Sequence, residues 1–287
     1  MSFEDLPPLP KMIHPEAYAY AERCTVLSRR ALRVCRSHLD LAYGTDYWQR
    51  LDVFVPSGNF SRLPVFVFMH GGAWSSGCKE WMGFMAPSLV GAPAVFVSVS
   101  YRKAPDCRMA GQFADVAHAL AWISRKIAAY GGDPARLLIG GHSAGGHLAT
   151  LVSLKPDEVK AASGFDVSAI RAVLPVSAPL DLRLDPANPE ESLARVHAQV
   201  LDEPGRAAEF SPLAFAAQAR VPFFLTWGEK DFPRIRRQNA AMAAALRAHG
   251  TPLEELEIAG ASHFDTNLTA ANPSSPWTET ALRMLSA

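Results

Sequence analysis

The sequence has no excess of charge of either sign. Its 287 residues carry 28 lysines and arginines against 28 aspartates and glutamates, so the formal net charge is zero with histidine neutral. A balanced chain generates no global field that favours nucleic acid or an anionic membrane. We therefore expect a small molecule as the partner and no nucleic acid, while a homodimer stays open.

Long hydrophobic runs are also absent. The longest, LPVFVFM at 63–69 and PAVFVSVS at 93–100, are far shorter than the roughly 20 residues that a membrane helix needs. The N-terminal stretch MSFEDLPPLPKMIHPE carries acids and prolines where a secretory signal has a basic start and an apolar segment. These features predict a cytosolic protein that does not enter a membrane.

Cysteine is scarce, and its spacing matches no known motif. None of the four cysteines forms a CxxC pair or has zinc-finger spacing. We expect reduced, structural thiols, and neither a metal ion nor a cofactor. One of them, Cys78, is close in sequence to the motifs described below, so a place in the site stays open for it. The four are Cys24, Cys35, Cys78 and Cys107.

What the chain does contain is a series of short β-rich runs, most of them apolar throughout. Strands without a polar face are covered on both sides, which is typical of a mainly parallel sheet. Helical patterns alternate with these runs, so the predicted class is α/β. The predicted strands are 51–56, 65–70, 94–101, 136–143, 170–178, 222–228 and 253–260, and the predicted helices are 15–39, 79–89, 109–130, 144–154, 234–248 and 277–285.

One region interrupts the alternation of strand and helix. Residues 180–215 are rich in proline, aspartate and glutamate, a composition that indicates short helices and loops. A small cap or lid above the strand ends is the hypothesis that fits. Because a chain of this length can bury one substantial core, we expect a single domain, 1–287, with an N-terminal helical segment at 1–40.

Glycines gather around one serine and two histidines at 137–149, LLIGGHSAGGHLA. A phosphate loop requires a lysine after the glycines, and a dinucleotide fingerprint requires G-x-G-x-x-G near the first strand; the stretch meets neither condition. His142 and His147 lack the H-E-x-x-H register of a zinc-binding helix. The pattern therefore disfavours phosphate and metal binding.

The same stretch contains a G-x-S-x-G pentapeptide, at 141–145, between a predicted strand and a predicted helix. In that context the pattern indicates a nucleophile elbow, a sharp turn whose small neighbours let the serine Oγ project above the sheet. Ser143 is the candidate nucleophile. The N–H of Ala144, at the helix N-terminus, is a candidate donor to an oxyanion.

A second glycine motif, HGGAW at 70–74, directly follows an apolar strand. Acyl transfer needs two backbone N–H groups aimed at the developing oxyanion, one beside the nucleophile and one from a glycine-rich loop. We therefore predict an oxyanion hole formed by Gly71, Gly72, Ala73 and Ala144. A plain glycine turn would not require His-Gly-Gly at this place.

An acid and a base follow the serine in chain order. Asp231 comes just after the strand at 222–228, and His263 comes just after the strand at 253–260, which is the order serine, acid, histidine. Asp265 is too close to His263 to orient it. Alternatives stay open, with Asp181 or Asp202 as the acid and His147 or His197 as the base. We interpret His142 as a packing residue beside the elbow, and His14, His38, His118 and His249 as surface or helix residues.

Taken together, these motifs resemble the α/β-hydrolase superfamily, specifically its carboxylesterase and kynurenine formamidase group, from residue 47 onward. The similarity lies in YWQRLDVFVP, HGGAW followed by a lysine-containing turn, VSYRKAP, YGGDPARLLIGGHSAGGHLA, GEKDFP and GASHFD. The ending SHFDTNLTAANPSSPW adds to the likeness to kynurenine formamidases. The chain departs from that subfamily at Ala73, where a tyrosine is more typical, and in the cap.

The resemblance implies the α/β-hydrolase fold, a mainly parallel eight-stranded sheet flanked by helices. It also implies a serine hydrolase that acts on a small ester or amide, with Ser143, Asp231 and His263 as its triad and hydrolysis of N-formylkynurenine to kynurenine and formate as its reaction. A general short-chain or aryl carboxylesterase is the alternative, and a non-catalytic binding protein is a remote one. Trp74 either forms a wall of the substrate pocket or only seals the strand end.

Overall fold

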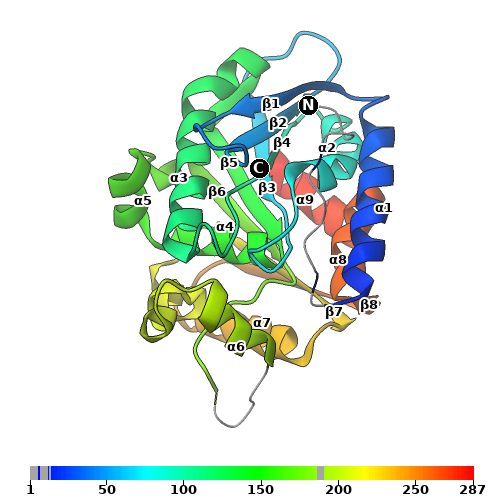
Figure 1. Ribbon diagram of the computed structural model, residues 1–287. Helices are drawn as coiled ribbons and strands as arrows, with labels where there is room; N and C mark the ends of the chain where they lie inside the picture. Colours follow the sequence, from blue (N-terminus) through cyan, green and yellow to red (C-terminus); the bar gives the residue numbers. More distant parts are fainter. Residues whose placement is uncertain (1–5, 7–11, 13, 186–190) are drawn as a thin grey trace.

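An eight-stranded sheet runs through the centre of the protein (Figure 1). The computed structural model describes residues 6, 12, 14–185 and 191–287. The strands lie in the order β1-β2-β4-β3-β5-β6-β7-β8. Strand β2 is antiparallel to β1 and β4, and the other neighbours are parallel, which confirms the mainly parallel α/β sheet. The strands are β1 (Arg36–Ala42), β2 (Arg50–Val55), β3 (Leu63–Met69), β4 (Val95–Val99), β5 (Gly132–His142), β6 (Ile170–Val176), β7 (Phe223–Lys230) and β8 (Leu253–Ser262).

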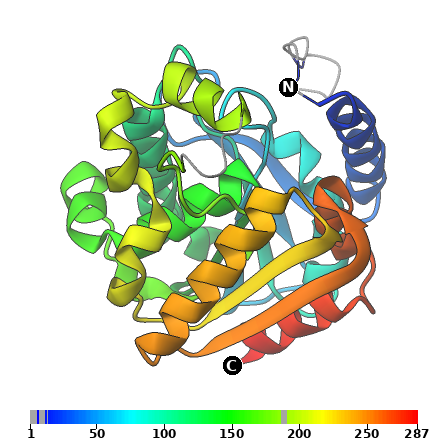
Figure 2. The ribbon, with the colours of Figure 1, turned by 90° about the horizontal axis from the view of Figure 1, so that it is seen from below.

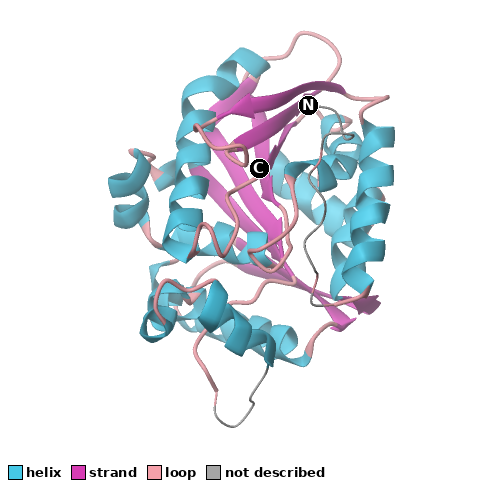
Figure 3. Ribbon diagram, in the orientation of Figure 1, coloured by secondary structure: helices cyan, strands magenta, loops and turns pink. Residues whose placement is uncertain are grey.

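Helices cover both faces of this sheet (Figure 3). Alternate residues of β3 enter two separate cores: Val65, Val67 and Met69 pack on the face of α3, α4 and α7, and Phe66 and Phe68 pack on the face of α1, α2 and α9. Both sides of a strand are thus apolar, as the continuous runs predict. The helices are α1 (Glu16–Ala31), α2 (Ala86–Val90), α3 (Met109–Lys126), α4 (Ala144–Leu154), α5 (Pro156–Ser163), α6 (Glu191–Gln199), α7 (Pro233–Ala248), α8 (His263–Leu268) and α9 (Pro276–Ser286).

The predicted helix at 15–39 is wrong in its C-terminal part. Helix α1 ends at Ala31, and Arg36–Ala42 forms β1 at the edge of the sheet. None of the seven residues of β1 is buried, so this segment lacks the apolar run from which a strand is predicted. It pairs with the next strand, β2, across the loop at 43–49, and the pairing includes a register shift between His38 and Leu41. The helical segment expected at 1–40 is therefore a helix followed by an edge strand.

The predicted helix at 79–89 is also wrong, because it breaks into two 3₁₀ turns (Lys79–Trp81 and Gly83–Met85) and the short α2. The hydroxyl of Ser28 on α1 interrupts it. Ser28 Oγ donates to the Trp81 carbonyl at 3.3 Å and accepts from the Phe84 N–H at 2.9 Å. A side chain that takes both backbone groups competes with the helical ladder.

The region predicted as a cap, 180–215, forms short helices in its described part. Helix α6 is followed by 3₁₀ turns at Pro204–Phe210 and Pro212–Gln218, and residues 186–190 lie outside the described residues. Figure 2 shows this region beside α7. Leu193, Val196 and Phe210 bury their side chains in the core of the α4 and α7 face. Of the helices described, none is both long and apolar enough to cross a lipid bilayer.

Candidate active site

Ser143 occupies the sharp turn between β5 and α4. Its backbone has φ 51° and ψ −119°, a conformation that is uncommon for a residue with a side chain. Its N–H donates to the Val176 carbonyl on β6 at 2.8 Å, which fixes the turn against the neighbouring strand. The turn needs small neighbours, since a Cβ on Gly145 would collide with the carbonyl of Met69. The local geometry is that of a nucleophile elbow.

Two late strand ends bring an imidazole and a carboxylate to this serine. His263, the first residue of α8, follows β8, and its Nε2 lies 3.0 Å from Ser143 Oγ. Asp231 follows β7, and its Oδ1 lies 2.8 Å from His263 Nδ1. The carboxyl ends of parallel strands share one edge of a sheet, so residues far apart in sequence meet there. The structure thus places the three predicted triad residues in one hydrogen-bonded line.

The carboxylate of Asp231 is held by more than the histidine. Ser177 Oγ donates to its Oδ2 at 2.5 Å, and the Phe232 N–H donates to its Oδ1 at 2.8 Å. Burial raises the pKa of Asp231, but His263, the Ser177 hydroxyl and the Phe232 N–H outweigh it and bring the pKa below its ordinary value. An ionised carboxylate beside Nδ1 suits a role in orienting the imidazole and stabilising its charged form.

His142 holds the backbone of His263 through a hydrogen bond. Its Nε2 lies 2.9 Å from the His263 carbonyl, and a carbonyl only accepts, so the proton is on Nε2. Its Nδ1 lies 3.3 Å from the hydroxyl of Tyr20, which in turn accepts from the Asn267 amide. Burial, and next the charge of His263, lower the pKa of His142 to about 3. This neutral side chain therefore links α1 to the backbone of the candidate base.

The predicted oxyanion loop, residues 70–74, lies against Ser143. A Cβ on Gly71 would lie 3.2 Å from Ser143 Cβ, which measures how closely the loop approaches. Gly72 has φ 124° and Ala73 has φ 50°, and the Gly72 carbonyl accepts from the N–H groups of Ser75 and Ser76 in a tight turn. Ala144 opens α4 directly after Ser143. Gly71 and Ala144 thus lie beside the candidate nucleophile, and Gly72 and Ala73 line one cavity with it.

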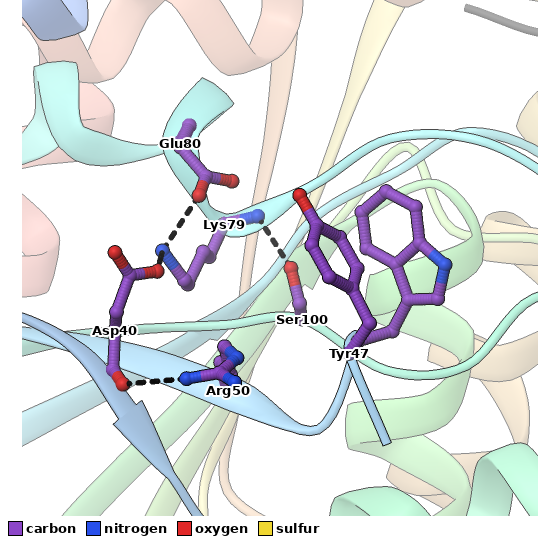
Figure 4. Close-up of a pocket in the computed structure, with 7 residues that line it drawn as sticks. Asp40, Tyr47, Arg50, Lys79, Glu80 and Ser100 are labelled. Carbon is purple, nitrogen blue, oxygen red and sulfur yellow. Dashed lines mark hydrogen bonds and ion pairs between the residues drawn. The ribbon is translucent and has the colours of Figure 1, made fainter. Parts of the chain in front are cut away.

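A buried lysine anchors the far end of this loop (Figure 4). Lys79 Nζ lies 2.6 Å from Glu80 Oε1 and 2.9 Å from Asp40 and Asp52. Burial lowers the pKa of Lys79, but Asp52 and Glu80 raise it above its ordinary value. Its backbone N–H donates to Ser100 Oγ at 2.7 Å. The lysine-containing turn after HGGAW is thus a structural anchor that ties the loop to β1, β2 and the end of β4.

A cavity of about 620 Å³ opens beside Ser143 and His263. The oxyanion loop, α1, the start of α8, α6 and the start of α7 all contribute to its lining. A second cavity of about 440 Å³ also borders His263 and shares with the first the lining residues His14, Tyr20, Phe232 and Phe264. The candidate nucleophile therefore borders a space large enough for a small aromatic substrate.

Comparison with known proteins agrees with this geometry. Residues 51–246, most of the chain, match the BD-FAE family. The chain belongs to the BD-FAE family. It is 32% identical to the esterase LipQ of Mycobacterium tuberculosis over 248 residues, which are 80% of this chain and 58% of LipQ. It is 28% identical to a kynurenine formamidase of Danio rerio, over 83% of this chain and 78% of that protein.

Solved structures show the same fold. A Pyrobaculum calidifontis esterase matches with a TM-score of 0.74 at 20% identity, over 94% of this chain and 92% of that one. The carboxylesterase EstE1, cloned from a metagenomic library, matches with a TM-score of 0.72 at 22% identity, over 95% of each chain. This BD-FAE chain therefore has the α/β-hydrolase fold. It spans little more than half the length of LipQ.

The alternative acids have other partners in this BD-FAE chain. Asp181 pairs with Arg183 at 2.6 Å, and Asp202 accepts from the Ala110 N–H at 3.0 Å, at the start of α3. Asp265, which is too close to His263 in sequence to orient it, accepts from Ser262 in the capping box of α8. The structure thus brings only Asp231, among the acids weighed, to the candidate base.

The alternative bases are likewise engaged elsewhere. His147 accepts from the Trp74 indole N–H at 3.3 Å and donates to the Phe210 carbonyl at 2.7 Å, and His197 donates to the Leu182 carbonyl at 2.7 Å. Trp74 is almost fully buried, yet it borders the cavity. Most of its surface thus packs in the core, and the rest forms part of a wall of the cavity. Cys78 is buried in the core of the α1 face, and all four cysteines are free.

Four residues around the triad were not predicted from the sequence. His14, interpreted as a surface or helix residue, is partly buried just before α1; it lines the cavity, and its ring stacks on Phe232 with centroids 4.7 Å apart. Tyr20, Phe232 and Ser177 also contact the triad or its supports. Phe232 and Ser177 have one sequence signal, which is their position at strand ends. Tyr20 and His14 have none, since the packing of α1 and of the residues just before it brings them to the site.

Proposed function

We propose that this protein is a serine hydrolase that cleaves a small ester or aryl formamide through an acyl-enzyme, with kynurenine formamidase-like turnover as the best candidate. The observation that carries the proposal is the line from Ser143 Oγ through His263 to Asp231, at 3.0 and 2.8 Å. Three such groups beside a glycine-rich loop are what acyl transfer requires.

In the proposed first step, His263 Nε2 takes the proton of Ser143 as Oγ attacks the substrate carbonyl. Asp231 holds the imidazole so that Nε2 faces the serine, and stabilises the imidazolium that forms. Backbone N–H groups of Gly72, Ala73 and Ala144 stabilise the tetrahedral oxyanion, with an expected contribution of about 3 kcal/mol from each donor. His263 then returns the proton to the leaving group, and water hydrolyses the acyl-enzyme.

Two relatives support different substrates. The similarity to the Danio rerio kynurenine formamidase supports N-formylkynurenine as the substrate of this protein. The formyl group of that substrate needs little room on the acyl side, while its aryl group needs a pocket. The aromatic lining of the cavity, which includes Tyr20, Trp81 and Phe264, suits that aryl group. LipQ, named an esterase, favours the alternative of a short-chain or aryl carboxylesterase. A cytosolic location stays a prediction from the sequence, and a homodimer stays open.

The decisive test compares wild type with Ser143→Ala. The variant should lose hydrolysis of a generic aryl ester while keeping its circular dichroism spectrum and melting temperature. Undiminished hydrolysis by the folded variant would contradict the role of this serine and return the fold to the binding-protein alternative. A side-by-side measurement of kcat/KM for N-formylkynurenine and short p-nitrophenyl esters separates the two substrate classes, and a marked preference for the esters would favour the carboxylesterase.

A further inference from the structure

His142 is the last residue of β5 and directly precedes the candidate nucleophile. It is 2% exposed, so the polar atoms of its ring find their partners inside the protein. The Nε2–H donates to the carbonyl of His263 at 2.9 Å, and the ring centroids of the two histidines lie 5.0 Å apart. One side chain thus joins the strand that leads into Ser143 to the backbone of the candidate base.

The same ring lies against the predicted oxyanion loop. A Cβ on Gly71 would lie 2.7 Å from His142 Nδ1, which is closer than a Cβ can pack, so the glycine lets the loop approach the ring. The nucleophile, the base and the loop come from three separate parts of the chain. His142 adjoins the first and lies against the other two.

The backbone of His263 has little support from its own segment. The residue opens α8, a helix of six residues, and residues 259–260 shortly before it are exposed. The candidate acid holds the imidazole but not the backbone that carries it. The His263 carbonyl accepts from Thr266 within the same helix at 2.8 Å, whereas the bond from His142 connects it to β5, in the interior of the sheet. The second bond therefore ties the base to a rigid part of the molecule.

Tyr20 and Asn267 keep His142 in the tautomer that makes this bond. The Asn267 amide donates to the Tyr20 hydroxyl at 2.8 Å, which leaves the hydroxyl proton for His142 Nδ1 at 3.3 Å. With Nδ1 accepting, the one N–H of a neutral imidazole is at Nε2. The two side chains come from α1 and α8, which lie side by side in Figure 1. The packing of these helices thus fixes the direction of the hydrogen bond to the base.

We propose that His142 is a positioning residue, which holds the candidate base and the oxyanion loop at the distances from Ser143 that acyl transfer needs. The inference rests on the proposed hydrolase function and adds a residue to its machinery. Ser143 Oγ and His263 Nε2 are 3.0 Å apart, and a displacement of about 1 Å between reacting groups costs roughly 100-fold in rate. His142 acts through the base and the loop, so its loss lowers kcat and leaves KM nearly unchanged.

Two variants at this position separate the hydrogen bond from the bulk of the ring. In His142→Gln the amide reaches the place of Nε2 and donates to the His263 carbonyl, whereas in His142→Asn it ends at the place of Nδ1. The asparagine variant should lower kcat on an aryl ester by roughly 10- to 100-fold, and the glutamine variant should stay within about fivefold of wild type. His197→Asn is the matched control and should keep kcat, because His197 Nε2 also donates to a carbonyl, that of Leu182, in the region predicted as a cap.

Inactivation by an alkyl phosphonofluoridate is a second readout, which depends on no assignment of the substrate. Ser143 Oγ bonds to phosphorus, fluoride leaves, and His263 accepts the serine proton, so the inactivation rate follows the activation of the serine. That rate should fall together with kcat in the asparagine variant and stay near the wild-type rate in the glutamine variant. Circular dichroism and melting temperature show which variants are folded.

Equal kcat and equal inactivation rates in wild type and both folded His142 variants would overturn the positioning role. A loss shared equally by the two variants would overturn it too, because the donor at Nε2 would then not be what matters. If neither variant folds, Tyr20→Phe decides: it should lower both rates by about threefold or more, and unchanged rates would overturn the inference. Folded wild type that neither hydrolyses the ester nor reacts with the phosphonofluoridate would remove the proposed function and this inference with it.

Discussion

Ser177 Oγ lies 2.5 Å from Oδ2 of Asp231, and Ser177 holds a left-handed backbone conformation, with φ 50°, to reach it. The residue is fully buried at the end of β6, where its N–H donates to the Thr226 carbonyl at 2.7 Å. Its hydroxyl also lies 2.8 Å from Thr266 Oγ1 on α8. A strained residue at such a place is held by its surroundings, and here it fixes the candidate acid.

Replacing Ser177 with alanine or with glycine should lower kcat/KM by roughly 10- to 100-fold, because each change removes a hydrogen bond to a buried carboxylate. The two variants differ in strain. Glycine accepts φ 50° and should give a protein about 1 kcal/mol more stable than alanine does. Kinetics of both variants measures the effect of losing the hydroxyl, and urea unfolding measures the effect of the backbone strain. Full activity in both variants would show that the hydroxyl does not position Asp231.

Asp231→Asn should lower kcat by about 10⁴-fold, the loss known for the equivalent change in a comparable triad, since an amide does not hold the same imidazole tautomer. Steady-state kinetics on an aryl ester measures it. Asp202→Asn is the control, because that carboxylate accepts only from the backbone of Ala110 among its described contacts. If the Asp202 variant were inactive and the Asp231 variant active, the assignment of the acid would be wrong.

Gly72→Ala should lower kcat by roughly 100-fold or more, the effect of losing an oxyanion donor. Gly72 has φ 124°, and a Cβ there would collide with the carbonyl of Ser76, so the loop has to shift. Gly164→Ala is a matched control, with φ 75° and nothing within 4 Å of the added Cβ. It should cost about 1 kcal/mol of stability and leave turnover unchanged. Equal kinetics in the two variants would argue against an oxyanion role for this loop.

The protein should lose stability as the pH falls below 6.5. Burial lowers the pKa of His70 and His142 to about 3 and that of His147 to about 4, against an ordinary value of 6.5. Between these values the unfolded chain binds protons that the folded protein does not, so acid favours unfolding. Each histidine then removes up to about 1.4 kcal/mol of unfolding free energy per pH unit.

Urea unfolding at pH values between 7 and 4.5 measures this slope. His147→Gln should make it shallower by about 1.4 kcal/mol per pH unit, because one of the three groups is gone. His249→Gln, at the exposed end of α7, should leave the slope as it is in wild type. An unchanged slope in the His147 variant would contradict the suppressed protonation of that histidine.

Much of the candidate site follows from local pattern. Residues 70–74, residues 141–145 and Asp231 follow apolar runs, and His263 follows the predicted strand at 253–260. In a parallel sheet the carboxyl ends of neighbouring strands share one edge. The glycine motifs mark turns that only small residues permit. Strand order did not have to be known in advance for these residues to be expected near one another.

Other features were beyond prediction because they depend on packing across the chain. Tyr20 meets His142 over 122 positions of sequence, and Ser177 meets Asp231 over 54. The edge strand β1 has no buried residue, and the helix predicted at 79–89 is broken by a hydroxyl from α1. Periodicity reports only which faces are apolar.

The sequence alone thus determined the α/β class, the nucleophile turn and the order of the candidate triad, because each is a property of short segments and of the strand ends that they follow. Tertiary structure decided which groups support that triad and what lines the cavity beside it. Ser177 and His142 acquire their contacts with the candidate triad only when α1, α8 and the strand ends pack together, since the distance between two side chains is set by that packing and not by their separation in sequence.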